Sequence, residues 1–271
     1  GWNETTGDSE RASIVMNVEG GKLSFNGEAN VMSLTVAENA VLGGNAVYKL
    51  DTFTNNGTLA PGNSIGTMVI QGDYVEGKNG RLSLEFDGSG QTDKIVIEGS
   101  AKKEDDSAPT FRADLAPADG YFAGTITADF SEAVSIVKKD EEGNESTFHG
   151  TLKVEHAGSS QPLDVASPTV SMTGTFDESG VLTVEVKREA NAYGRYAVTD
   201  EARGIAAAFD RYASIAEGDM QNLVAALDFS SQDGSDLQNA YEALSPDVFS
   251  RAGAASLNVF RHVSNALQNV S

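Results

Sequence analysis

The segment 55–99 constrains the fold more than any other part of this sequence, because short apolar runs alternate in it with clusters of glycine, asparagine and aspartate. The apolar runs are 68–70, 82–86 and 95–97. This rhythm is typical of strands joined by tight turns. Strands this short are not stable alone, so they must stack on neighbouring strands to bury an apolar face, as in a solenoid. The sequence therefore predicts a mainly β chain built as a stack of short strands.

Composition narrows the classes of function. The 271 residues are 39% hydrophobic, which is enough for a sizeable core, and they include no cysteine. Disulfides and thiolate metal sites are thereby excluded. The formal net charge of −21 argues against nucleic acid or an anionic membrane surface as partner, because both are polyanions. The simplest interpretation of this net charge is a well-solvated surface.

The first part of the chain shows the two-residue period of strands. Residues 22–26 and 33–36 alternate polar and apolar side chains, and glycine-containing turns lie at 19–21, 26–28 and 43–45. Successive strand–turn units are about twenty residues apart, as in other solenoids. Residues 1–13 give no periodic signal, and we interpret them as a frayed end or the tail of an upstream coil. We expect 1–100 to form the coils.

The pattern loosens over 101–198. Charged clusters at 102–106 and 138–142 indicate solvated loops or hairpin tips. Between and after them, alternation predicts strands at 125–130, 133–137, 151–155 and 181–186. We expect this β-rich segment to cap the solenoid, because a last coil would otherwise expose an unpaired edge and an apolar face.

From Thr199 the period changes to that of a helix, so 199–271 is predicted to be helical. The first predicted helix has Asp200 as its N-cap and buries a stripe of Ile205, Phe209, Tyr212 and Ile215. A second predicted helix buries apolar residues between 220 and 227. A third starts at Ser235, with Gln238 completing a capping box. A last, long helix covers about 246–268 and has small residues at its centre.

Three stretches carry a family resemblance: Asn56-Gly57-Thr58-Leu59-Ala60-Pro61-Gly62-Asn63-Ser64-Ile65-Gly66-Thr67, then Gly72-Asp73-Tyr74, then 87–94 (DGSGQTDK). Their order and spacing resemble the C-terminal end of autotransporter passenger domains, the type V secreted proteins of Gram-negative bacteria. Residues 198–209 and 241–245 resemble the segment that links passenger to translocator in that family. No motif of the family matches 102–168, so the role of this insert stays open.

The resemblance implies a right-handed parallel β-helix that ends in an autochaperone-like segment and a helical linker entering a membrane β-barrel. That barrel, absent from this sequence, is the expected partner, and the cell surface is the expected location. The implied function is structural and non-enzymatic, without cofactor or metal. The residues that the resemblance marks as structural are Asn56, Gly57, Pro61, Gly62, Asn63, Ser64, Gly66, Asp87, Gly88, Gly90 and Asp93, and the apolar rungs Leu82, Leu84 and Phe86 join them.

Other chemistries compete with the structural interpretation. An adhesin-type module could bind host surface molecules through its acidic flank or the 102–168 insert. Ser64 lies in a G-x-S-x-G motif, which in hydrolases needs a strand before it and a helix after it, whereas a strand is predicted here. The oxygen-rich run 87–93 resembles a calcium loop but lacks the bidentate glutamate, so an Asx turn is favoured. Gly7-Asp8-Ser9-Glu10, the S-x-x-K match at 135–138, Trp2 and the pair His149 and His156 are interpreted as coincidental or structural.

Overall fold

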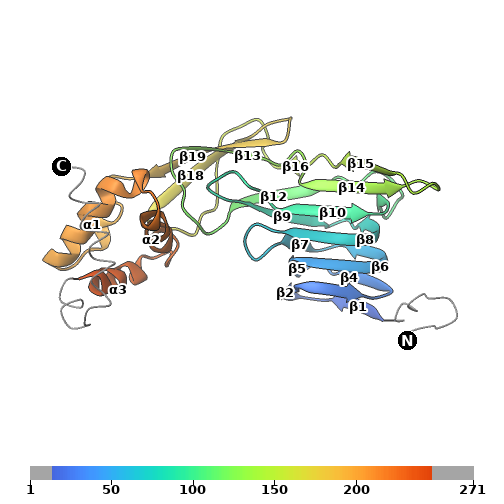
Figure 1. Ribbon diagram of the computed structural model, residues 1–271, viewed down its shortest axis with the longest axis horizontal. Coiled ribbons are helices and arrows are strands. Elements are labelled where there is room, and N and C mark those ends of the chain that lie inside the picture. The colour runs from blue at the N-terminus through green and yellow to red at the C-terminus, as the bar shows by residue number, and fades with distance from the viewer. Residues whose placement is uncertain (1–13, 246–271) are drawn as a thin grey trace. The chain divides into compact units, whose positions relative to one another are not determined.

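The computed structural model describes residues 14–245 (Figure 1). Within this range the chain forms two compact units, of which the first contains 14–118, 127–161 and 174–184 and the second contains 119–126, 162–173 and 185–245. Four of the predicted features lie outside the described residues: the frayed end or upstream tail at 1–13, Trp2, the motif at 7–10 and the long last helix.

Two parallel sheets form most of unit 1. The larger is a 9-stranded sheet whose main path is β1 (Val15–Val18), β4 (Ser33–Val36), β6 (Ala46–Asn55), β8 (Thr67–Glu76), β10 (Lys94–Glu98), β14 (Val134–Lys139) and β15 (Glu145–His149), while β3 (Gly27–Asn30) pairs with β6 and β11 (Ala101–Lys103) with β8. The second is a 6-stranded sheet in the order β16 (Lys153–Val154), β12 (Arg112–Pro117), β9 (Arg81–Phe86), β7 (Thr58–Pro61), β5 (Ala40–Gly44) and β2 (Gly21–Ser24).

The chain passes back and forth between these two sheets and adds its strands in sequence order, as the succession of colours in Figure 1 shows. Neighbouring strands in both sheets run parallel, except for the antiparallel hairpin β14–β15. Hydrophobic residues at register positions therefore stack on one another. One such column is Leu42, Leu59 and Leu82, all buried. The mainly β class predicted from the sequence is confirmed, with parallel sheets.

An aromatic column runs through the same core. The rings of Phe25, Tyr48, Phe53, Tyr74 and Phe111 follow one another with centroid separations of 6.0, 5.6, 6.2 and 6.0 Å. Offset aromatic contacts at these distances are favourable beyond the area that they bury. The parallel pairing that holds this column continues past residue 100, because β12 pairs with β9 and β14 with β10.

The remaining strands form a 4-stranded sheet in the order β13 (Thr125–Asp129), β19 (Val181–Arg188), β18 (Val170–Phe176) and β17 (Gln161–Pro162). The division between the two units passes through these strands. Sequence patterning found β13 and β19 but missed β6 and β18. Both contain threonine, serine or glycine at positions where the apolar alternation weakens.

Unit 2 contains the helices α1 (Asp200–Tyr212), α2 (Asp219–Asp228) and α3 (Ser235–Leu244) and the 3₁₀ turns η1 (Gly194–Tyr196) and η2 (Ala213–Ile215). They enclose a core made of Tyr193, Ala206, Phe209, Val224, Leu237 and Tyr241, among others. Within residues 14–245 no helix combines the length and the apolar character that crossing a membrane would require.

Three details of the helix predictions were wrong. The N-cap of α1 is Thr199, whose hydroxyl accepts a hydrogen bond from the amide of Ala202, and Asp200 is already the first helical residue. Ser235 is likewise the first residue of α3 after Gly234, so the capping box does not form. Ile215 is 67% exposed because α1 ends at Tyr212 and the chain turns before the predicted stripe is complete.

Candidate functional site

The residues marked by the resemblance lie between the end of β6 and the start of β10. Pro61 is buried at the end of β7, and Asn63 and Ser64 are exposed in the bend that leads to β8. The side chain of Asn63 accepts a hydrogen bond from Ser24 Oγ at 2.7 Å and donates one to Asn26 at 3.2 Å. Asn56 accepts from the amide of Asn79 at 3.1 Å. These asparagines thus tie turns that lie next to one another in the stack.

Asn55, which sequence reasoning passed over in favour of Asn56, is the buried member of this set. Its Oδ1 accepts from the amide of Gly57 at 3.1 Å, and its Nδ2 donates to the Tyr74 hydroxyl and the Arg81 carbonyl at 3.2 and 3.3 Å. Since it is fully buried, each of these polar contacts replaces water that the side chain has lost. The Asn-Asn-Gly cluster was the available sequence signal, but its two asparagines look alike in the sequence.

Gly57 and Gly62 are required for different reasons. A Cβ atom on Gly57 would lie 2.2 Å from the carbonyl oxygen of Ala37 and 2.5 Å from that of Ala40, so no side chain fits there. Gly62 has φ of +82°, which other residues adopt only at a cost. Asn63, which follows it, has no positive φ.

Asp93 joins two strands through its carboxylate. Oδ1 accepts from the amide of Gly66 and Oδ2 from the amide of Glu85, both at 2.8 Å, and the side chain is fully buried. Burial raises the pKa of this carboxyl to about 7, although the two backbone N–H groups act in the opposite direction. The carboxyl therefore changes its charge near neutral pH while it holds the turn.

The run 87–93 forms an Asx turn. Asp87 Oδ1 accepts from the amides of Ser89 and Gln91 and from Ser89 Oγ, at 2.8, 3.0 and 2.7 Å, and Gly90 has φ of +86°. Gly88 lies between them without a positive φ. Within the described part of the chain, no group of three or more histidine or acidic side chains is placed to hold a metal ion.

The serine motifs lack the geometry of known nucleophiles. The G-x-S-x-G motif of Ser64 lies between β7 and β8, so no helix follows it, in contrast to a nucleophile elbow. Ser135, in β14, is the register partner of His149 in β15, and Ser135 Oγ lies 3.4 Å from His149 Nδ1. Both side chains are on an exposed hairpin, and among residues 14–245 no carboxylate is hydrogen-bonded to that imidazole.

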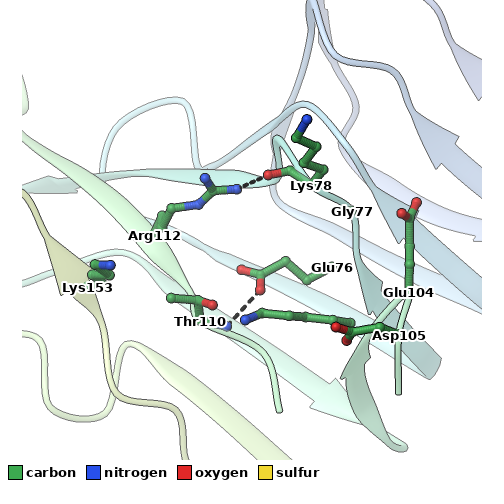
Figure 2. A pocket seen from close by; sticks show the side chains of 9 residues that line it. Glu76, Gly77, Lys78, Glu104, Asp105, Thr110, Arg112 and Lys153 are labelled. Atoms are coloured by element: carbon green, nitrogen blue, oxygen red, sulfur yellow. Dashed lines mark hydrogen bonds between the residues drawn. The ribbon is translucent and has the colours of Figure 1, made fainter. Parts of the chain in front are cut away.

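A pocket of about 390 Å³ opens in unit 1 between the ends of β8, β11, β12 and β16. Figure 2 shows it from close by; it is lined by Glu76, Gly77, Lys78, Lys103, Glu104, Asp105, Thr110, Arg112 and Lys153. Glu76 is almost fully buried, and its two carboxylate oxygens accept from the amides of Thr110 and Phe111 at 2.7 and 2.9 Å. Arg112 donates to the carbonyl oxygens of Lys78 and Gly80. Sequence reasoning did not find this pocket, because its walls come from four separate parts of the chain.

A second polar cluster is buried in unit 2 around Asp228. The side chain of Asp228 is 1% exposed, forms an ion pair with Arg188 and accepts from the hydroxyls of Thr169 and Tyr193. Arg188 also donates to the carbonyl of Phe122 at 2.9 Å. Burial and the adjacent Asp228 carboxylate raise the pKa of the Tyr193 phenol. This almost fully buried ion pair fixes how the segments around α2 pack, while Arg188 Nε is buried without a hydrogen-bond partner.

No protein-family model matches the chain, and no curated protein is significantly similar to it.

Proposed function

We propose that this chain is the membrane-proximal part of an autotransporter passenger: a right-handed parallel β-helix stem, a β-rich segment that closes it and a helical linker toward the translocator. The observation that carries the proposal is the pair of parallel ladders, in which each strand pairs with the next strand of the same sheet along the chain. Stacked coils of one solenoid produce this connectivity.

The proposed task is to fold first on the cell surface and to provide an edge on which upstream coils assemble. A strand that adds to an existing ladder forms hydrogen bonds and buries apolar surface without a new nucleus. The first described strands suit such growth: Ile14, Val15 and Leu23 are 55, 50 and 37% exposed at the end of both ladders. The residues marked in the turns then act as structural ties, with no cofactor or catalytic step.

The test uses the complete precursor, expressed in a Gram-negative host, with protease added to intact cells. Wild-type protein is expected at the surface and resistant to the protease. Gly57→Ala should yield protein that the protease degrades, because the added methyl group clashes with the carbonyls of Ala37 and Ala40. Ser64→Ala, in the next turn along the chain and exposed, is the matched control and should behave as wild type.

Absence of wild-type protein from the surface would refute the secretion proposal. Equal protease resistance of Gly57→Ala and wild type would instead refute the role given to the stem. Turnover of an ester by wild type but not by Ser64→Ala would replace both with a hydrolase.

One observation favours a second function, an adhesin-type module. Every residue of β15 is exposed, and Phe148 in this strand is 54% exposed with Lys138 Nζ 5.7 Å from its ring centroid. An exposed aromatic side chain beside a cation is suited to contact a host protein or glycan. Phe148→Ser should then abolish binding of the chain to host cells, while Ile215→Ser, which removes another exposed apolar side chain, should not. Equal binding by both variants and wild type would exclude this function.

A further inference from the structure

The cations of this acidic protein are distributed unevenly. Six basic side chains of residues 14–245 make neither an ion pair nor a contact with an aromatic ring: Lys22, Lys78, Lys94, Lys103, Arg112 and Lys153. Four of the six line the pocket shown in Figure 2. The chain has 40 acidic residues and only 19 basic ones, so most cations could find a carboxylate as partner. Four cations without an ion pair thus line one pocket, together with the carboxylates of Glu76, Glu104 and Asp105.

The strand register places two of these cations side by side. Arg112 in β12 and Lys153 in β16 are direct register partners in a parallel ladder. Like charges at directly opposite positions destabilise a sheet. The nearest acidic side chain on this strand, Asp114, is already engaged by the guanidinium of Arg81 at 2.7 and 2.9 Å. Arg112 itself is held by backbone carbonyls, and its Nε is buried without a hydrogen-bond partner, so no carboxylate neutralises it.

The acidic residues of the pocket do not fill this role. Both oxygens of Glu76 are occupied by backbone amides. Asp105 is exposed and accepts hydrogen bonds from the amide and hydroxyl of Ser107. In Figure 2 the exposed Glu104 and Asp105 lie on the opposite side of the pocket from Lys153 and Arg112. Arg112 and Lys153 therefore lie on one side of the pocket, and the buried Glu76 lies between that side and Glu104.

We propose that this pocket binds a small ligand through a phosphate or sulfate group, with Arg112 and Lys153 as the residues that receive the anion. Tetrahedral oxyanions accept several charge-assisted hydrogen bonds at once, which suits an arginine and a lysine at register-paired positions. The volume of about 390 Å³ admits a group of monosaccharide size. The net charge of −21 repels long polyanions, so the ligand is a small molecule and not a polymer. This inference does not depend on the secretion proposal.

The experiment is calorimetric titration of the full chain with inorganic phosphate, inorganic sulfate, a monosaccharide phosphate and a monosaccharide sulfate, each at constant ionic strength set with sodium chloride. We expect saturable binding, with dissociation constants of roughly millimolar for the inorganic ions. Affinity is expected to be higher for the saccharide that carries the right group, which identifies the source of the anion.

Lys153→Gln should weaken binding by about three- to tenfold, because it removes one charge-assisted donor. The Lys153 side chain is exposed, so the fold should persist, as circular dichroism will show. Lys22→Gln removes an equally unpaired lysine outside the pocket and should leave affinity unchanged. Heat that does not saturate with any of the four probes, or an equal loss in Lys22→Gln, would overturn the proposal.

Discussion

Replacing Asp93 with asparagine should change how the stability of the protein depends on pH. The carboxyl is fully buried, with a pKa of about 7 in the folded chain against 3.8 when it is free in solution. Between these two values the folded chain holds a proton that the unfolded chain has released. The free energy of unfolding therefore falls as pH rises through this window.

The structure sets the size of the effect. Each pKa unit is worth about 1.4 kcal/mol, so this group lowers the free energy of unfolding by up to about 4 kcal/mol between acidic pH and pH 8. Asparagine keeps the shape and one oxygen acceptor but has no proton to release. Near pH 4, where the aspartic acid is neutral, the variant should be less stable than wild type by about 1–3 kcal/mol, because its NH2 group leaves the amide of Gly66 or Glu85 without an acceptor. Toward pH 8 the difference should shift in favour of the variant by about 4 kcal/mol.

Urea unfolding followed by circular dichroism, from pH 4 to pH 8 at constant ionic strength, measures both curves. The difference between variant and wild type isolates this carboxyl from all other titrating groups. Asp129→Asn provides a control of opposite sign, because hydrogen bonds from Ser131 lower the pKa of Asp129. Its contribution to stability is present at neutral pH and is lost as pH falls through the lowered pKa.

A flat difference curve for Asp93→Asn would refute the reasoning. A variant whose free energy of unfolding is about 1–3 kcal/mol below wild type at neutral pH, and equal to it in acid, would be stronger evidence against the reasoning. It would mean that the amides of Gly66 and Glu85 outweigh burial and keep the carboxylate charged.

Three further substitutions test the packing. Gly57→Ala should lower the free energy of unfolding by at least about 2 kcal/mol, measured by urea unfolding, because its Cβ overlaps two backbone carbonyls; a neutral effect would mean that the turn is loosely packed. Asn55→Ala should cost about 2–3 kcal/mol by the same assay, since it orphans the buried amide of Gly57, whereas the exposed Asn63→Ala should cost under about 1 kcal/mol. Asp228→Ala should cost about 3–5 kcal/mol by leaving Arg188 charged and unpaired, with thermal unfolding as readout; recovery in Arg188→Met/Asp228→Leu would confirm that cause, and persistence of the full loss would contradict it.

Much of the strand content was predictable because its causes are local. Alternating apolar side chains located β4, β9, β13 and β19, and glycine-rich clusters marked turns such as the one at Gly62. Helix periodicity found α1, α2 and α3. Its errors at Asp200, Ser235 and Ile215 arose at helix ends, where a one-residue shift in the cap changes which side chains face the core.

The candidate sites were less predictable because their members are brought together by register. Nothing near Arg112 in the sequence indicates that Lys153 is its neighbour, since the pairing of β12 with β16 sets this contact. Asn55 and Asn56 are the same residue type. Only the position of Asn55 at the end of β6, with its side chain buried, makes it the acceptor for the Gly57 amide. Asp228 and Arg188 are 40 residues apart and each looks like a surface charge in its own segment.

The sequence by itself determined a mainly β chain of short strands and glycine turns with helices at its end, because those preferences depend on residues a few positions apart. Only the tertiary structure decided which polar groups lose their water: the Asp93 carboxyl, the Asn55 amide, the Asp228–Arg188 pair and the cations around the pocket. Their behaviour depends on burial and on partners far along the chain, and both are properties of the stacked strands and packed helices and not of any local pattern.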